Sequence, residues 1–395
     1  MLKRSIRDLK LDGKRLFVRV DLNVPLTDGA VGDDTRIRAA LPTLRFAIDR
    51  GASLVLAAHL GRPKGQPVAS LSLKPVAAHL ETLLERPVTF AFDCIGPAAA
   101  RAVQNAGPSG VTLLENLRFH AEEEANDRKF SAALAALADC YVNDAFGSAH
   151  RAHASTVGIV PHVTDAAAGL LLARELEYLG SLLAAPARPF VAILGGSKVS
   201  GKLEVIDNLL PRVDTLLIGG AMAYTFFKAR GLPIGRSLVE PDLVGTTRET
   251  ERRAKECGVE LALPTDHLVT TALKPDAPYE CLAIDDRTIG DRLGVDIGPE
   301  TQRTYKAIID AASTVVWNGP MGVFEIEPFN RGTVAVAKSV AASAGTTIVG
   351  GGDSVAAIAK AGVTDHVSHI STGGGASLEF LGGRTLPGVA ALPDQ

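Results

Sequence analysis

Short apolar runs alternate with amphipathic stretches of helical length through most of the chain, a pattern typical of βαβ units and parallel sheets. The runs in the first half predict five strands, at Leu16–Val20, Leu54–Ala58, Val88–Ala91, Thr112–Leu114 and Cys140–Asn143. Those in the second half predict six more, at Phe190–Leu194, Thr215–Ile218, Glu260–Leu263, Thr314–Trp317, Thr346–Val349 and His366–Ile370. The pattern therefore predicts an α/β protein with two doubly wound, Rossmann-like domains, each built on a parallel sheet and joined by a helix and a hinge.

Helix signals between the strands suggest where the domains divide. Pro75 lies near the start of one predicted helix, and Asp165 is placed to cap a connector helix that ends before the proline-containing stretch at 184–189. The predicted parts are an N-terminal domain over 1–170, a connector helix over 171–188, a second domain over 189–380 and a tail over 381–395. The tail is too short to fold alone, so we expect it to pack on the N-terminal domain.

Composition narrows the class of protein. The chain has 395 residues, of which 46% are hydrophobic and 22% are charged, as in a soluble globular protein large enough for two cores. Lys and Arg total 41 against 44 for Asp and Glu. The net charge of −3 gives no electrostatic reason to bind nucleic acid or an anionic membrane. The charged segment 1–13 has no apolar core of a signal peptide, so we expect a cytoplasmic protein.

The four cysteines lie far apart, at positions 94, 140, 257 and 281. The chain has no C-x-x-C motif, and no histidine follows a cysteine at the spacing of a zinc site. We therefore expect buried, reduced thiols. His150 and His153 are spaced like a metal pair, but the sequence offers no third ligand near them.

Arginine and other polar residues gather where the first-half strands end. Ligands of doubly wound sheets bind beyond these carboxyl ends. The side chains placed there are Asp21, Asn23, His59, Arg62, Arg118 and Arg151, and Arg36 at the start of the first helix is placed to join them. Guanidinium forks favour phosphate or carboxylate, so this pattern indicates a site for a small, highly charged anion. The alternative is a set of unrelated surface arginines.

Glycine-rich turns follow three second-half strands. The first, at 194–202, satisfies G-x-x-x-x-G-K, but Leu203 stands where a P-loop needs a hydroxyl for Mg²⁺. The second, at 349–354, ends in Asp353 and Ser354, which suit Mg²⁺ and phosphate. The third, at 371–376, has no acid. None fits G-x-G-x-x-G with a ribose-binding acid, which argues against a nicotinamide-dependent oxidoreductase. A non-catalytic anion-binding module would explain the arginines but not these turns.

Nine stretches together resemble one family, phosphoglycerate kinase. They are RVDLNVP (19–25), HLGRPKG (59–65), LLENLRF (113–119), NDAFGSAHRAHAS (143–155), LGGSKVSGK (194–202), IGGAMAYTF (218–226), WNGPMGVFE (317–325), GGGDS (350–354) and STGGGASLEFL (371–381). They occur in family order and span nearly the whole chain. The resemblance implies a monomeric glycolytic enzyme that reversibly moves a phosphoryl group from 1,3-bisphosphoglycerate to Mg-ADP, giving 3-phosphoglycerate and ATP.

The resemblance also implies roles for single residues. The implied phosphoglycerate site consists of Asp21, Asn23, Arg36, His59, Arg62, Arg118 and Arg151. The implied nucleotide site consists of Gly195, Lys198, Lys202, Gly219, Asn318, Glu325, Gly351, Gly352, Asp353 and Ser354, with Asp353 as the ligand of Mg²⁺. Arg36, Lys198 and Gly374 would act on the phosphoryl group in transfer. Two departures are mild, since Ala221 replaces a third glycine of some members and Ser354 replaces a common threonine.

This chemistry agrees with the residue types present. The acceptor in the reverse reaction is a carboxylate, which is ionised near neutral pH, so no general base is needed. Phosphoryl transfer depends mainly on positioning and charge neutralisation. We therefore expect a site rich in arginine and lysine and poor in candidate bases.

Overall fold

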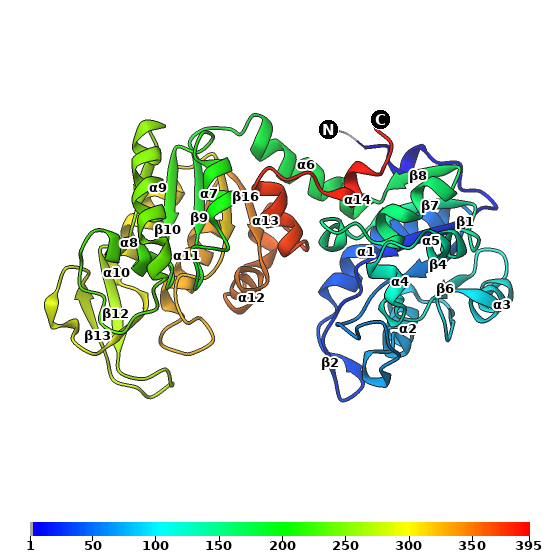
Figure 1. Cartoon of the computed structure of the whole chain (residues 1–395), viewed down its shortest axis with the longest axis horizontal. Helices are drawn as coiled ribbons and strands as arrows, with labels where there is room; N and C mark the ends of the chain where they lie inside the picture. The colour runs from blue at the N-terminus through cyan, green and yellow to red at the C-terminus, as the bar shows by residue number, and fades with distance from the viewer. Residues whose placement is uncertain (1–2) are drawn as a thin grey trace. The chain divides into compact units, whose positions relative to one another are not determined.

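The structure is a computed structural model that describes residues 3–395 (Figure 1). The chain forms two compact units. The first runs to Gly180 and also includes Thr385–Gln395, and the second is Ser181–Arg384. Each unit contains its own six-stranded parallel sheet, which confirms the predicted fold class. The border between the units falls inside helix α6 (Leu170–Ala184).

The sheet of the first unit has the strand order β5-β6-β4-β1-β7-β8, with every pair parallel. The strands are β1 (Arg15–Val20), β4 (Ser53–Ala57), β5 (Val88–Phe90), β6 (Val111–Leu113), β7 (Cys140–Asp144) and β8 (Asp165–Ala168). Alternate side chains of β1 enter different cores. Leu16 and Val18 belong to the cluster that includes α1 (Thr35–Asp49) and α2 (Lys74–Leu84), whereas the Phe17 ring lies 6.1 Å from that of Tyr141. Both faces are therefore covered, as parallel sheets require.

The prediction that Asp165 caps the connector helix is wrong. Residues 165–168 form the edge strand β8, because their backbone pairs with β7, and α6 begins at Leu170. The cap comes from a distant position. The Asp144 carboxylate, at the end of β7, accepts hydrogen bonds from the backbone N–H groups of Leu171 at 2.9 Å and Leu172 at 3.1 Å. Burial raises the pKa of Asp144 to about 6.

The sheet of the second unit has the order β11-β10-β9-β15-β16-β17, again parallel throughout. Its strands are β9 (Phe190–Leu194), β10 (Thr215–Ile218), β11 (Glu260–Ala262), β15 (Thr314–Asn318), β16 (Thr346–Gly350) and β17 (His369–Ile370). Trp317 on β15 is fully buried against α10 (Pro299–Asp310) and α11 (Arg331–Ala342). The strand order reverses between β9 and β15, which is where doubly wound sheets bind ligands.

A second, antiparallel sheet in this unit was not expected from the sequence. It contains β13 (Tyr279–Ala283), β12 (Asp266–Thr270) and β14 (Leu293–Ile297), in that order. The outer strand β13 is mostly exposed, and Glu280 interrupts its short apolar sequence, so it lacks the continuous apolar run that marks the buried parallel strands. Figure 1 shows β12 and β13 beside α8 (Ala223–Ala229) and α10, toward the edge of the second unit.

The cysteine expectation is half right. Cys94 and Cys140 are buried and free, but Cys257 and Cys281 are exposed. Cys257 is the C-cap residue of α9 (Val244–Glu256), and Cys281 lies on the mostly exposed outer strand β13. The spacing of the cysteines along the sequence could not reveal these positions.

The C-terminal tail is held by the first unit. Two hydrogen bonds connect its helix α14 (Pro387–Ala390) to this unit. The side-chain amide of Asn143, on β7, donates to the Gly388 carbonyl at 3.1 Å. The Gly388 N–H donates to the Ala149 carbonyl, in the loop after β7, at 2.8 Å. The Lys3 ammonium donates to the Leu392 carbonyl at 2.9 Å. Leu392 itself is 2% exposed.

Among the described residues 3–395, none of the helices has the length and apolar character needed to cross a bilayer.

The tail should contribute to the stability of the first unit. We expect Leu392→Ala to lower the free energy of unfolding by about 2–5 kcal/mol, the usual cost of truncating a buried leucine. The measurement is urea unfolding followed by far-ultraviolet circular dichroism. The control is Leu273→Ala, at a leucine that is 52% exposed, where a change within about 0.5 kcal/mol is expected. Equal effects of the two substitutions would contradict this role of the tail.

Candidate active site

A buried arginine organises the polar cluster of the first unit. Arg19 is 0% exposed although it lies on β1, between two apolar neighbours. Its guanidinium donates to the hydroxyls of Ser155 at 2.9 Å and Ser148 at 3.3 Å, and it lies 3.0 Å from Nδ1 of His59. These contacts join the end of β1 to the loops that follow β4 and β7.

The buried acid Glu123 partly balances this charge. Burial raises the pKa of Glu123, while the Arg19 charge and hydrogen bonds from Ser155 oppose the rise. Both the N–H and the hydroxyl of Ser155 donate to the Glu123 carboxylate, at 2.9 and 2.6 Å. The acid and the arginine thus share Ser155 as a bridging group.

Two histidines of this cluster are neutral near neutral pH. Burial and the charge of Arg19 hold the pKa of His59 well below its usual value. Burial and the charge of Arg118 lower the pKa of His153 to about 4. Several positive charges therefore act on each ring. The charge of Arg36 also lowers the pKa of His59, and the charge of Arg151 also lowers the pKa of His153. The cluster is electropositive, as an anion site requires.

Hydrogen bonds hold four more of the residues that the sequence suggested for this site, namely Asp21, Asn23, Arg36 and Arg118. The Arg36 guanidinium donates to the buried Asp21 carboxylate at 2.9 Å. The Asn23 side-chain oxygen accepts from the Gly61 N–H at 2.9 Å, and the Arg118 guanidinium donates to the Gly61 carbonyl at 2.9 Å. The two others, Arg62 and Arg151, are exposed, and Arg151 donates to His150 at 3.1 Å.

Arg19, Glu123 and His153 were not identified as site residues from the sequence. The signal for Arg19 was available, since a charged residue inside an apolar strand needs a buried partner. No sequence signal marks Glu123, which is one of three consecutive acids and differs from its neighbours only in being 0% exposed.

In the second unit, a cavity of about 350 Å³ lies at the reversal of strand order between β9 and β15. Nine of the residues suggested by the sequence line it, namely Gly195, Lys198, Lys202, Asn318, Gly351, Gly352, Asp353, Ser354 and Gly374. The Lys202 ammonium donates to the Asn318 amide oxygen. Lys198 and Asp353 are exposed to the opening, whereas the Ser354 hydroxyl is buried and accepts from the Gly319 N–H at 2.6 Å.

An adjoining cavity of about 270 Å³ is largely apolar. It shares Gly196, Ser197, Pro320 and Asp353 with the first cavity, so the two are continuous. Its lining includes Ala221, Tyr224, Phe227, Leu238, His267, Val295 and Glu325. Four of these side chains, Tyr224, Phe227, His267 and Val295, come from α8 or from the antiparallel sheet, which explains why the sequence did not indicate this wall.

Two glycines are required by close packing beneath these cavities. A Cβ atom on Gly195 would lie 2.2 Å from the Pro320 carbonyl oxygen, and one on Gly219 would lie 2.3 Å from the Met321 sulfur. Because real Cβ atoms do not approach so closely, neither position accepts a side chain without a shift of its neighbours. These glycines therefore bring the ends of β9, β10 and β15 close enough to form the cavity floor.

Comparisons with known proteins show the family to which the chain belongs. The family model for phosphoglycerate kinase matches residues 6–384. The phosphoglycerate kinases of Solibacter usitatus and Moorella thermoacetica are 58% identical over 393 residues and 56% identical over 395 residues, and these matches cover 98% and 100% of both chains, respectively. The phosphoglycerate kinase structure from Coxiella burnetii matches with a TM-score of 0.88 and 41% identity, covering 98% of both chains. The structure from Pyrococcus horikoshii matches with a TM-score of 0.86 and 34% identity over 99% of this chain and 98% of that one.

The fold and the comparisons define a two-unit α/β phosphotransferase with a carboxyl group as acceptor. The chain belongs to the phosphoglycerate kinase family. Its reaction is the reversible transfer of a phosphoryl group between 1,3-bisphosphoglycerate and ADP in glycolysis, giving 3-phosphoglycerate and ATP. The alternatives of an oxidoreductase and of a non-catalytic anion-binding module are therefore wrong.

The charge of Lys202 should depend on pH within the working range of an assay. Burial lowers the pKa of this ammonium to about 8, and the Asp353 charge offsets only part of the effect. The positive charge is therefore present below about pH 8 and lost as the pH rises through that value. If Lys202 binds nucleotide phosphate, kcat/KM for ATP should fall by roughly tenfold or more between about pH 7 and 9.5.

Lys202→Arg is the matched variant for this prediction, because arginine keeps its charge over the whole range. We expect the variant to lack the alkaline fall, whatever its absolute rate. The measurement is initial rate against ATP concentration across the pH range, with 3-phosphoglycerate saturating. Parallel profiles for the wild type and the variant would assign the fall to another group.

Proposed function

We propose that the polar cluster of the first unit binds 3-phosphoglycerate or 1,3-bisphosphoglycerate and that the two cavities of the second unit bind the nucleotide. The observation that carries this assignment is the continuity of an apolar cavity with one lined by glycines and lysines. A nucleotide has the same two-part character, with an aromatic base at one end and a chain of phosphates at the other. Gly196 and Asp353, two of the four residues shared by the cavities, would lie where the two parts meet.

On the phosphoglycerate side, Arg62, Arg118 and Arg151 are proposed to hold the phosphate that is not transferred. Their guanidinium groups offer paired donors to phosphate oxygens. Asp21 and Asn23 accept hydrogen bonds within the cluster, and the carboxylate of Asp21 fixes the orientation of Arg36. The neutral ring of His59 can donate a hydrogen bond without adding a charge.

On the nucleotide side, the apolar cavity is proposed to take adenosine, with Gly219 and Ala221 beneath the base and Glu325 accepting a ribose hydroxyl. Lys202 is proposed to neutralise the phosphate chain. The N-terminus of α12 (Gly352–Lys360) supports this placement, since Gly351, Gly352 and Ser354 present backbone N–H groups at a helix start.

Asp353 is proposed as the protein ligand of Mg²⁺. The donor set fits this ion, because a single exposed carboxylate lines the phosphate cavity and Mg²⁺ usually takes one or two carboxylates, several waters and phosphate oxygens. When bound, Mg²⁺ would neutralise charge on the phosphate oxygens. The same carboxylate would orient the nucleotide phosphates relative to Lys198 and Lys202.

The transfer step needs positioning rather than a base. The acceptor carboxylate of 3-phosphoglycerate is already ionised, and the leaving group in the other direction is the same carboxylate. Arg36 and Lys198 are proposed to stabilise the charge on the phosphoryl group in transfer, with the backbone N–H groups near Gly374 as further donors. Because the substrates are assigned to different units, transfer needs a conformation that brings the reacting atoms within about 3–3.5 Å.

We also propose that the enzyme acts as a cytoplasmic monomer with only small-molecule substrates as partners. Each proposed substrate site is built from residues of one chain, so neither needs a residue from a second copy. The four cysteines are free, which suits a reducing compartment.

The direct test of the proposed metal requirement uses the purified protein with 1,3-bisphosphoglycerate and ADP. We expect ATP formation in the presence of Mg²⁺, loss of activity when the ion is chelated, and recovery when Mg²⁺ is added back. Asp353→Asn should raise the Mg²⁺ concentration needed for half-maximal rate. Full activity in excess chelator would overturn the metal assignment without affecting the substrate assignments.

Lys198 is expected to act mainly in the transition state. Its ammonium is exposed at the cavity opening, whereas Lys202 is fixed to Asn318. We expect Lys198→Ala to lower kcat by roughly 10²- to 10³-fold, the usual cost of removing one preorganised charge-stabilising group. The matched control is Lys228→Ala, on α8 but outside both cavities. An unchanged kcat would exclude the role.

Arg62 and Arg151 are expected to act in ground-state binding. Replacing either with alanine should raise KM for 3-phosphoglycerate by roughly ten- to a hundredfold, the value of one hydrogen-bonded charge, and leave KM for ATP nearly constant. The control is Arg101→Ala, at an exposed arginine of α3 (Gly96–Ala106) in the same unit. A rise in KM for ATP instead would show that the two sites are assigned to the wrong units.

A further inference from the structure

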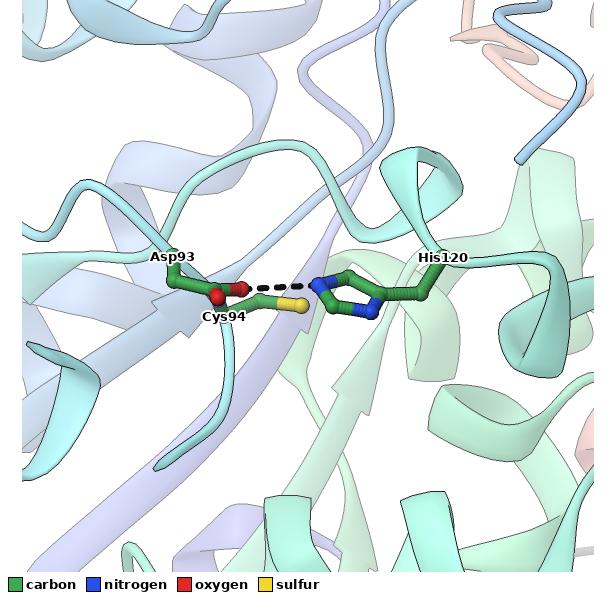
Figure 2. Close-up of side chains that lie close together, drawn as sticks. All are labelled: Asp93, Cys94 and His120. Carbon is green, nitrogen blue, oxygen red and sulfur yellow. Dashed lines mark hydrogen bonds and ion pairs between the residues drawn. The ribbon is translucent and has the colours of Figure 1, made fainter. Parts of the chain in front are cut away.

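Three side chains of different metal-binding types converge in the first unit, apart from the residues assigned to either substrate. Asp93 and Cys94 precede helix α3, and His120 follows the short helix η3 (Leu117–Phe119). One donor atom from each, a carboxylate oxygen, the thiol sulfur and an imidazole nitrogen, lie within 4.8 Å of one another. Figure 2 shows the Asp93 and Cys94 side chains pointing toward the same edge of the His120 ring.

The group is held in place by the surrounding protein. The His120 Nε2 atom lies 2.7 Å from the Asp93 carboxylate, which also accepts the Cys94 backbone N–H at 2.7 Å. The other side of His120 packs against Phe130, with ring centroids 5.3 Å apart. Cys94 is 1% exposed, while the side chains of Asp93 and His120 are 42% and 28% exposed. The donors are therefore largely preorganised, and solvent reaches the cluster from the Asp93 and His120 side.

We propose that Asp93, Cys94 and His120 form a binding site for a borderline-soft divalent cation, with Zn²⁺ as the type case. Thiolate sulfur, imidazole nitrogen and carboxylate oxygen are the three zinc ligand types, and three protein ligands leave the fourth tetrahedral position for water. Tetrahedral bond lengths place donor atoms roughly 3.3–3.6 Å apart. The contact between Asp93 and His120 is shorter than this, so binding needs a small widening of the cluster.

Binding of the ion would displace one proton. As the metal–sulfur bond forms, the Cys94 thiol loses its proton to solvent, and His120 binds through the lone pair of Nε2 while the neutral ring keeps its proton on Nδ1. The thiolate and the Asp93 carboxylate then balance the two positive charges of the ion. This site differs in ligand chemistry from the proposed Mg²⁺ site, because Mg²⁺ prefers oxygen ligands.

A nucleophilic triad is the competing interpretation of the same three residues. A triad needs the histidine to contact the acid through one ring nitrogen and the thiol through the other. Here both Asp93 and Cys94 face the ring edge that carries Nε2 (Figure 2). The sulfur is also too buried to meet a substrate. Convergence on one point favours a shared cation.

Cobalt titration tests the proposal directly, because Co²⁺ replaces Zn²⁺ and a cobalt–thiolate bond gives a charge-transfer absorption that oxygen ligands do not. The full-length protein is titrated with Co²⁺ in excess Mg²⁺, which occupies carboxylate sites that prefer hard ions. We expect a thiolate-to-cobalt band that saturates at one ion per chain and disappears when Zn²⁺ is added.

Substitutions assign the ligands. Cys94→Ser should abolish the band, and His120→Gln and Asp93→Asn should each raise the Kd for Co²⁺ by at least roughly tenfold. The matched controls are Cys257→Ser and Cys281→Ser, which remove the exposed thiols and should leave the titration unchanged. Circular dichroism checks that each variant is folded, and if Cys94→Ser does not fold, the other two variants decide. No band in the wild type, or a band that is unchanged in the folded variants of the cluster, would overturn the proposal.

Discussion

The reversal of strand order in a parallel sheet is the constraint on which the candidate active site depends. In the second unit, the chain builds β9, β10 and β11 in one direction and then adds β15 on the other side of β9. The loops after β9 and β15 diverge toward opposite faces, which leaves room for a ligand between them. Gly195 donates its N–H to the Asn318 carbonyl at 3.0 Å, so the floor of the cavity is made of backbone rather than side chains.

In the first unit, side chains rather than backbone hold together the loops at the carboxyl edge of the sheet. Strand β1 has β4 on one side and β7 on the other, so the loops after all three strands reach the same edge of the sheet. Arg19 joins these loops through His59, Ser148 and Ser155. A fully buried guanidinium is costly unless each of its hydrogen bonds is made. That requirement fixes the positions of the loops, and two of these loops carry Arg62 and Arg151, which are proposed to bind phosphate.

The polar cluster of the first unit is electropositive because its buried positive charges outnumber the buried acid that faces them. One buried acid, Glu123, faces Arg19 and Arg118, and the two histidines remain neutral because burial, and then the nearby arginines, oppose their protonation. A doubly charged phosphate would supply the missing negative charge, so the cluster is better suited to the bound state than to the free state. Phosphoryl transfer to a carboxylate needs this excess of positive charge and not a base, because the reacting groups are already ionised.

The sequence by itself determined the class of fold, the family and most residues that line the polar cavity of the second unit, whereas it missed Arg19, Glu123 and the wall of the apolar cavity. The fold class is readable because buried parallel strands are continuous apolar runs. Part of the site is readable because glycine at a strand end permits close backbone approach and arginine there supplies charge. The tertiary structure alone decided which residues far apart in the chain meet. Edge strand β8, the antiparallel sheet behind the apolar cavity and the partnership of Arg19 with Glu123 all depend on contacts that have no local pattern. The meeting of Cys94 with His120 is of the same kind, since only the packing of β5 beside β6 brings the segments after these strands together.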